Sequence, residues 1–561
     1  MLEQKPTDQK AIQEAMEKKL YERNFNKWGF DLNLFVSIGT IVMVCLLGLY
    51  SVLANAQVFG LAPANEVLSR VRESVVSNAD WLFILIVNSF ILLCIFLAFS
   101  KLGRVRLGGM KARPEFSNFA WYSMLLSAGM GIGLMFWAVG EPLSHFNNPG
   151  PIFNHENGAI SAMASTFLHW GLHPWAIYAV MALSLAYFAY NKNMPLSLRS
   201  VFYPLFKERV FGRLGDIIDL IAVVATMVGL ATSLGLGVQQ INSGLNYLVG
   251  LSISTFMQVI LITVITLVAV YSILSGIDKG VKTLSKWTIK LAFIFMILII
   301  LLGPTLYIIR LFTTSLGHYV SDLPSASFFL ALESGSAREW QSAWTIFYLA
   351  WWVSWSPFVG MFIARVSKGR TIREFIIAVL LVPSLISFIW LSTFGGTAFS
   401  IDGFASGGDL YNLSSEQLPI ALFELIERLD IALFQNVAVV LLSVLATGII
   451  IFFFITSSDS GSIVVNAITS GGKTSTKSRQ RVLWALAEGF IAAMLIIIGG
   501  EMALETLQDA VILTGLPFVL LMLVMCVLLV QNLQTTYRKQ ERQKQITHIR
   551  SLLECDDITD G

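Results

Sequence analysis

The stretch Trp351-Trp352-Val353-Ser354-Trp355-Ser356-Pro357 decides the fold, because it places three tryptophans and a proline in the middle of an apolar segment. This segment, 341–364, is long enough to cross a membrane as a helix. Proline donates no backbone hydrogen bond, and tryptophan usually lies at the membrane interface rather than in mid-span. We therefore expect the spanning helix to break here.

A second break is predicted in the segment 119–139, where Ser127-Ala128-Gly129-Met130-Gly131-Ile132-Gly133 repeats glycine at every second position. Each glycine weakens a helix by about 1 kcal/mol relative to alanine. Close helix packing through Gly129 and Gly133 is the alternative. A nucleotide-binding loop is excluded, because no strand precedes the glycines.

A third break is predicted near the end of the segment 433–458. There the apolar run through Phe453 is followed by Thr456-Ser457-Ser458-Asp459-Ser460-Gly461, which holds hydroxyls and a carboxylate. The alternative is an ordinary helix end that reaches the cytoplasm and exposes Asp459 and Ser460.

Composition places the chain in a membrane. Of its 561 residues, 55% are hydrophobic and only 13% are charged, whereas soluble domains carry about 25% charged residues. The loops 313–340 and 397–432 each contain an amphipathic piece, such as Leu418–Leu429, which is expected to lie along the membrane surface. Hydropathy predicts twelve spans, at 32–54, 81–100, 119–139, 163–190, 215–240, 252–275, 287–312, 341–364, 374–395, 433–458, 482–500 and 508–530.

Lysine and arginine follow the positive-inside rule. With the N-terminus in the cytoplasm, nearly all of them fall in the N-terminal arm (1–31), in even-numbered loops or in the C-terminal tail (531–561). Both termini are therefore predicted to be cytoplasmic, and residues 32–530 form the membrane domain. The exceptions are Lys290, inside a span, and Arg70, Arg72, Arg310, Arg338 and Arg428, on the opposite side.

The irregular spans are spaced as in an internal repeat. The third and eighth spans lie five apart, and so do the fifth and tenth. Transporters built from inverted repeats have broken helices at corresponding positions of their two halves, with solute and ion sites at the breaks. We predict an all-α polytopic membrane protein with twelve transmembrane helices, in which spans 3–7 and 8–12 form a 5+5 inverted repeat.

Aromatic residues dominate the predicted interior. We expect no Asp or Glu at the level of the breaks to act as counter-ion for a cation. The fourth span instead carries Trp170, Trp175 and Tyr178 around Pro174, and these rings are expected to face Trp352. Such a cage suits a quaternary ammonium group, which each ring attracts by about 0.5–2 kcal/mol. Core packing or interfacial anchoring is the alternative.

A sodium ion requires several oxygen ligands. The hydroxyls of Thr456 and Ser457, together with carbonyls freed where the third span unwinds, are expected to supply them.

Other kinds of chemistry have less support. The four cysteines form no CxxC or Cys/His cluster, so neither a disulfide framework nor a zinc site is indicated. The first 31 residues lack the apolar region of a secretory signal. His169 and His173 have a spacing that suits a metal, but with no intramembrane carboxylate beside them we do not expect an enzyme. A channel, with unsaturable and sodium-independent uptake, is the remaining alternative; no cofactor and no nucleic-acid partner are expected.

Four motifs resemble the betaine/carnitine/choline transporter family: Gly129–Pro142, Trp351–Arg365, Gly369–Glu374 and Thr456–Gly461. The similarity extends over essentially all twelve spans and is closest to sodium-coupled glycine betaine carriers. It implies a LeuT-type inverted repeat, a homotrimer and a location in the bacterial cytoplasmic membrane.

The resemblance also implies site residues. Its aromatic box corresponds to Trp170, Trp175, Tyr178 and Trp352, with Trp355 beside the solute on the cytoplasmic side and Gly129, Met130 and Gly131 in the adjoining unwound stretch. Its main sodium site corresponds to the backbone of Ser127, Met130 and Phe453 and the side chains of Thr456 and Ser457. A candidate second sodium site retains Thr226, but Leu230 fills the other threonine position.

Coupling is inferred from Gly133. Proton-coupled choline carriers of the family resemble Gly-Met-Gly-Ile-Asp, with aspartate at this position, and the carnitine exchanger lacks the glycine pattern. The resemblance therefore implies sodium symport of a small quaternary-ammonium solute, with glycine betaine as the first choice, for osmoprotection. Choline, carnitine, ectoine or proline betaine carriers, or an exchanger without sodium coupling, are the alternatives.

The C-terminal tail begins with the basic stretch 537–544. Basic residues beside anionic lipid gain about 1 kcal/mol per charge. A solvated tail is the plain interpretation, and regulation by osmolality is the functional one that the resemblance suggests.

Overall fold

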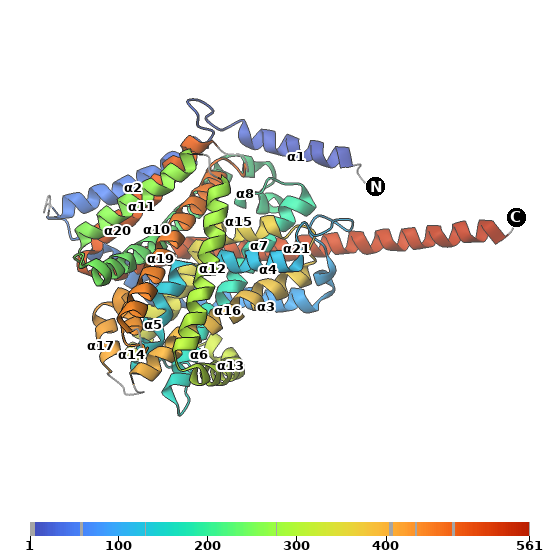
Figure 1. Ribbon diagram of the computed structural model, residues 1–561. Helices are drawn as coiled ribbons and strands as arrows, with labels where there is room; N and C mark the ends of the chain where they lie inside the picture. The colour runs from blue at the N-terminus through green and yellow to red at the C-terminus, as the bar shows by residue number, and fades with distance from the viewer. Residues whose placement is uncertain are drawn as a thin grey trace.

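The fold was analysed in a computed structural model that describes residues 6–55, 60–129, 131–275, 278–402, 408–431, 435–473 and 477–559. Within these ranges the chain is helical, and extended pairing is limited to two isolated bridges, Phe25 with Leu32 and Arg106 with Thr371. The long helices pack side by side in one bundle (Figure 1).

The first half of the chain forms helices α1 to α11. Their bounds are α1 Pro6–Tyr21, α2 Leu34–Asn55, α3 Ala64–Phe99, η2 Lys101–Arg104, α4 Asn118–Gly129, α5 Ile132–Asn147, α6 Gly158–Trp170, α7 Leu172–Lys192, α8 Leu198–Val201, α9 Tyr203–Phe206, η3 Lys207–Phe211, α10 Arg213–Val249 and α11 Thr255–Leu274.

The second half forms helices α12 to α21. Their bounds are α12 Asp278–Leu302, α13 Thr305–Ser327, α14 Ser336–Gln341, η4 Ser342–Ile346, α15 Phe347–Val366, α16 Ile372–Ile401, α17 Asp409–Glu416, η5 Leu418–Ile420, α18 Ala421–Glu427, α19 Gln435–Thr469, α20 Ser478–Gly499, η6 Gly500–Met502 and α21 Ala503–Thr559.

Ten helical segments among the described residues are long and apolar enough to cross a membrane. Each of the twelve spans predicted by hydropathy overlaps a helix. The two numbers differ because α4 and α5 are each shorter than a membrane span, and because α20 and α21 form one continuous helical segment. The chain is a multi-pass membrane protein.

The predicted break in the third span is confirmed. Helix α4 ends at Gly129 and α5 begins at Ile132. Gly131 between them is extended, with φ −165° and ψ −163°. The glycine-rich stretch therefore interrupts the helix rather than serving only as a packing surface.

The predicted break in the eighth span is wrong. Helix α15 continues through Pro357. Pro357 has no N–H to donate to the carbonyl of Val353, four residues earlier. The Ser356 hydroxyl donates to this carbonyl at 2.7 Å. This side-chain donor replaces the missing backbone donor. The irregular turn lies upstream instead, in the π-helical η4.

The predicted break in the tenth span is also wrong. Helix α19 runs without interruption through Thr456–Gly461 to Thr469. Asp459 is buried, not exposed at a helix end, and accepts a hydrogen bond of 2.8 Å from Arg481 of α20. The polar residues continue the helix because neighbouring helices provide their partners.

The fourth span is interrupted at Gly171, between α6 and α7. Pro174, around which the aromatic rings were expected to gather, falls in the first turn of α7, where proline costs no helical hydrogen bond. The interruption turns the end of α6, with Trp170, toward α15.

The amphipathic piece Leu418–Leu429, predicted to lie along the membrane surface, packs against other helices of the bundle. It forms η5 and α18; the apolar residues of α18 are buried, whereas those of η5 are half-buried. Leu418 packs over Gly140 of α5, and Phe423 packs over Gly244 of α10.

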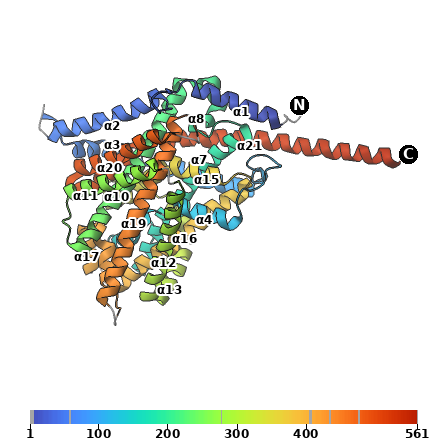
Figure 2. The same cartoon turned by 45° about the horizontal axis from the view of Figure 1, so that its top comes forward.

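Both ends of the chain continue as helices. Helix α1 lies beside the bundle, and α21 passes through it and projects well beyond it (Figures 1 and 2). No helix boundary falls at residue 531, because α21 carries the tail as an uninterrupted extension of the last apolar helix.

Candidate functional site

Rings from α6, α7 and α15 meet in the interior and form an aromatic cluster. Trp170 lies edge-to-face with Trp352, with ring centroids 5.0 Å apart, and Tyr178 lies 6.3 Å from Trp352 on another side. Trp175 packs edge-to-face on Tyr178 at 5.4 Å. We call Trp170, Trp175, Tyr178 and Trp352, together with Tyr348 at 5.8 Å from Trp352, the aromatic box.

Trp352 is fixed in orientation as well as in place. Its Nε1 donates to the carbonyl of His169 at 2.9 Å. This carbonyl belongs to the last turn of α6, where helix carbonyls have no partner within the helix. The interruption at Gly171 therefore supplies the acceptor that holds the central ring of the box.

A buried carboxylate lies directly behind the box, contrary to the expectation that none would be present. Glu141 of α5 is fully buried. Its Oε2 accepts from Trp170 Nε1 at 2.7 Å and from the Tyr348 hydroxyl at 2.5 Å. The predicted third span stopped at residue 139, but α5 continues to Asn147 and carries Glu141 into the interior.

Two histidines approach the other oxygen of Glu141. His169 Nδ1 lies 2.8 Å from Oε1, and His145 Nε2 lies 3.4 Å from it. The carboxylate that was not expected beside His169 is therefore present, and the ligand atoms of these three residues lie within 4.8 Å of one another. His173 does not belong to this group.

Two tryptophans lie so close to residue 133 that they leave room only for glycine. A Cβ at this position would lie 2.9 Å from Trp351 Cη2 and 3.0 Å from Trp170 Cη2. Aspartate, which the resembling choline carriers have here, does not fit with these rings in place. At Gly131, in the extended link between α4 and α5, a Cβ would be 3.7 Å from Trp355.

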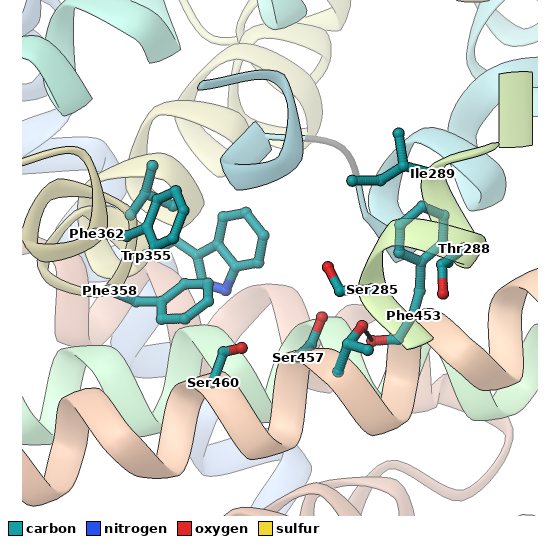
Figure 3. A pocket seen from close by; sticks show the side chains of 11 residues that line it. Ser285, Thr288, Ile289, Trp355, Phe358, Phe362, Phe453, Ser457 and Ser460 are labelled. Atoms are coloured by element: carbon teal, nitrogen blue, oxygen red, sulfur yellow. Dashed lines mark hydrogen bonds between the residues drawn. The ribbon is translucent and has the colours of Figure 1, made fainter. Parts of the chain in front are cut away.

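A cavity of about 120 Å³ lies one turn further along α15, between α12, α15 and α19. Figure 3 shows Trp355 and Phe358 on one side, Ser285 and Thr288 on the other, and Ser457 on α19 between them. The cavity thus brings together three helices that are far apart in the sequence. Its lining is Ser285, Thr288, Ile289, Trp355, Phe358, Val359, Phe362, Phe453, Thr456, Ser457 and Ser460.

The predicted sodium ligands of α19 all line this cavity. The Thr456 hydroxyl donates to the carbonyls of Phe452 and Phe453, at 2.8 and 3.2 Å. Because α19 is continuous here, its carbonyls remain inside a helix, and this helix offers the cavity the hydroxyl oxygens of Thr456, Ser457 and Ser460.

The ligands predicted on the third span are described only in part. Met130 lies outside the described residues. Ser127 and Gly129 form the last turn of α4, where carbonyls lack helical partners, but their side chains lie outside the described part of the structure.

Thr226, the candidate for a second sodium, does not line the cavity. It is fully buried in α10, and its hydroxyl donates to the Ala222 carbonyl at 2.6 Å. Leu230, one turn later, packs against Gly461 of α19. An apolar contact therefore fills the place where a second threonine would be needed.

Sequence reasoning missed four residues of these sites: Glu141, Tyr348, Ser285 and Thr288. The spacing 340, 344, 348 and 352 offered a signal for Tyr348, since aromatic residues four apart share one helix face. Ser285 and Thr288 offered none, because α12 reaches the cavity only through tertiary packing.

The fold and the site together define a multi-pass membrane protein with a buried cluster of aromatic side chains. The sequence matches the family described as "BCCT, betaine/carnitine/choline family transporter" over residues 34–538. The chain therefore belongs to the betaine/carnitine/choline transporter family, whose members are transporters and not enzymes.

Characterised relatives match over most of the chain. Glycine betaine transporter 1 of Vibrio parahaemolyticus is 44% identical over 91% of this chain and 96% of its own length. A glycine betaine/proline/choline/ectoine transporter of the same organism is 43% identical over 91% of this chain and 89% of its own length. The glycine betaine transporter OpuD of Bacillus subtilis is 40% identical over 85% of this chain and 91% of its own length.

Proposed function

We propose that the protein imports a small quaternary-ammonium solute, glycine betaine first, by symport with sodium, and that it serves osmoprotection. The observation that carries this proposal is the aromatic box around Trp352. Relatives that are named glycine betaine transporters support the choice of solute.

The chemistry of the box matches the methylated ammonium group. Such a group cannot donate hydrogen bonds, and its charge is spread over the methyl groups, so ring faces attract it without a tightly held ion pair. The rings contact one another directly, which means that a solute must separate them to enter. Binding is thereby linked to movement of α6 and α7 against α15.

Sodium is proposed to bind at the cavity between α12, α15 and α19, with the end of α4 as a further source of ligands. Thr456 and Ser457 would supply hydroxyl oxygens, and the last carbonyls of α4, near Ser127, would supply the rest. This is the arrangement of ion sites in transporters with interrupted helices. Because Leu230 fills the second threonine position, we propose one sodium site.

The wider architecture is part of the proposal. We propose twelve membrane-spanning helices with a LeuT-type 5+5 inverted repeat, both termini in the cytoplasm, and a homotrimer in the bacterial cytoplasmic membrane. The interruption of the third span and the lysine and arginine distribution support this arrangement. The basic start of the tail is proposed to contact anionic lipid.

The first test is uptake of labelled glycine betaine into liposomes that contain the purified protein. We expect saturable uptake that requires an inward sodium gradient and is competed by unlabelled glycine betaine. A potassium gradient and a proton gradient serve as controls. Uptake that persists without sodium would contradict symport, and uptake that does not saturate would indicate a channel.

The sodium site is tested by Ser457→Ala. The matched control is Ser443→Ala, because Ser443 is a buried serine of the same helix that lies outside the cavity lining. Loss of one oxygen ligand should raise the sodium concentration for half-maximal uptake by about tenfold, the scale of one lost charge-assisted contact. Ser443→Ala should change this concentration little. Equal sodium dependence in both variants would place the ion elsewhere.

A further inference from the structure

A negatively charged side chain, Glu141, lies beside the aromatic box. Glu141 makes hydrogen bonds to two of the rings, through Trp170 Nε1 and the Tyr348 hydroxyl. Both rings pack against Trp352, the third wall of the box. The carboxylate thus lies at the edges of two of the rings that form the box, and it is fully buried.

The charge of Glu141 is not cancelled by a permanent cation. Its ion-pair partners among the described residues are His145 and His169. His169 also lies 3.2 Å from the Thr345 hydroxyl through Nε2. A neutral imidazole satisfies both contacts, with Nδ1–H donating to Glu141 and Nε2 accepting from Thr345. No lysine or arginine of the described part of the chain pairs with this carboxylate.

These hydrogen bonds act on the rings as well as on the carboxylate. An indole N–H or a phenol O–H that donates to an anion shifts electron density into its ring. The ring face becomes more negative, which strengthens its attraction for a cation. In the low-dielectric interior the carboxylate also attracts a cation directly. Both effects grow with the net positive charge of the solute.

We propose that Glu141 is the counter-charge of the aromatic box and determines the net charge that the site accepts. This inference rests on the proposed function and extends its substrate class. Glu141 would admit singly charged quaternary ammonium cations, of which choline is the simplest, beside zwitterions such as glycine betaine. Glycine betaine depends on Glu141 less, because its own carboxylate offsets the attraction.

The experiment compares equilibrium binding of choline and labelled glycine betaine to the purified full-length protein in sodium buffer. In the wild-type protein both should bind. Glu141→Gln keeps the size of the side chain and an oxygen acceptor but removes the charge. We expect it to weaken choline binding by about tenfold, the scale of one buried unit charge several ångströms away, and glycine betaine binding by about threefold or less.

Two further variants separate charge from structure. Glu141→Asp keeps the charge and should keep the choline-to-betaine affinity ratio of the wild type, even if both affinities fall. It also gives a usable result if Glu141→Gln does not fold. Glu488→Gln removes an equally buried carboxylate of α20 that contacts Ser458 rather than the box, and it should leave the ratio unchanged.

The possible outcomes are distinct. A wild-type protein that binds glycine betaine but not choline overturns this inference and leaves the proposed function standing. An equal loss of both ligands in Glu141→Gln shows a purely structural role and also overturns it, as does a changed ratio in Glu141→Asp. A wild-type protein that binds neither ligand contradicts the proposed function itself.

Discussion

Gly133 shows how one residue limits what the site can be. Its absent Cβ leaves room for the rings of Trp351 and Trp170, which approach within about 3 Å of where that atom would lie. The resemblance to proton-coupled carriers, which have an aspartate at this position, led us to predict a role for Gly133 in coupling. The structure adds a steric role, since any side chain here displaces a wall of the aromatic box.

We predict that Gly133→Ala weakens glycine betaine binding by about tenfold or more, because Trp170 must shift and Trp352 loses its neighbour. Gly317→Ala is the matched control. Gly317 lies in α13, where a Cβ meets nothing within 4 Å, and alanine favours a helix over glycine. Binding measured by competition with labelled solute checks both. Unchanged affinity in Gly133→Ala would mean that the box does not hold the solute.

A second residue-scale prediction concerns Trp352. Trp352→Leu should weaken binding by about tenfold or more while the protein still folds and inserts, since the central ring and its cation–π attraction are lost. Trp352→Phe retains a ring and should lose less. The measurement is the dissociation constant for glycine betaine. If the leucine variant binds as tightly as the phenylalanine variant, Trp352 lies outside the binding site.

Among the helices, α15 differs most from its prediction. A proline in mid-span predicted a break, yet the helix is continuous, because Ser356 donates to the carbonyl that Pro357 leaves free. Serine and threonine commonly satisfy such carbonyls in membrane helices. The neighbouring serine was visible in the sequence, but the direction of its hydroxyl depends on the packing around it.

This compensation can be tested by a double-mutant cycle. Ser356→Ala leaves the Val353 carbonyl without a donor in an apolar interior, which costs about 1–3 kcal/mol. In Ser356→Ala with Pro357→Ala the backbone N–H at 357 can donate instead, so the double variant should recover most of the loss. Thermal unfolding of the detergent-solubilised protein compares the stabilities of the single and double variants. Losses of stability that add up in the double variant would show that the Ser356 hydroxyl does not donate to this carbonyl.

A network of charged side chains joins the N-terminal arm to α8 and α10. Arg199 of α8 lies 3.0 Å from Asp216 and 2.6 Å from Asp219, both at the start of α10, and all three side chains are buried. Arg23 of the N-terminal arm reaches Asp216 at 3.1 Å. The arm is thereby attached to the membrane domain through buried charge rather than through surface contacts alone.

We predict that Asp216→Asn destabilises the protein by about 3 kcal/mol, because it removes a charge that two arginines share in a buried site. Lys19→Ala removes an exposed ion pair with Glu208 and should change stability far less, because solvent screens such a pair. Melting temperatures of the two variants provide the test. Similar small shifts in both would show that the network is not stabilising.

Removal of the tail from Arg538 onward tests regulation at the same scale. Helix α21 projects beyond the bundle there (Figure 1), so the truncation should leave folding and solute affinity unchanged. We expect the dependence of uptake on external osmolality to change. An unaltered osmotic response would mean that this segment is only a solvated extension.

The sequence alone determined the class of protein, because hydropathy and the distribution of charge are properties of the chain in any arrangement. It also located the interruption at Gly129–Gly133, since glycine spacing acts on the local backbone, and it identified Trp170, Trp175, Tyr178 and Trp352 as residues of one group. The tertiary structure decided what depends on neighbours: the continuity of α15 and α19, the closure of η5 and α18 over the bundle, and the contribution of Ser285 to the cavity. Above all it decided the place of Glu141, because a carboxylate can be buried only where other elements supply its donors, and those donors are the rings of the site itself.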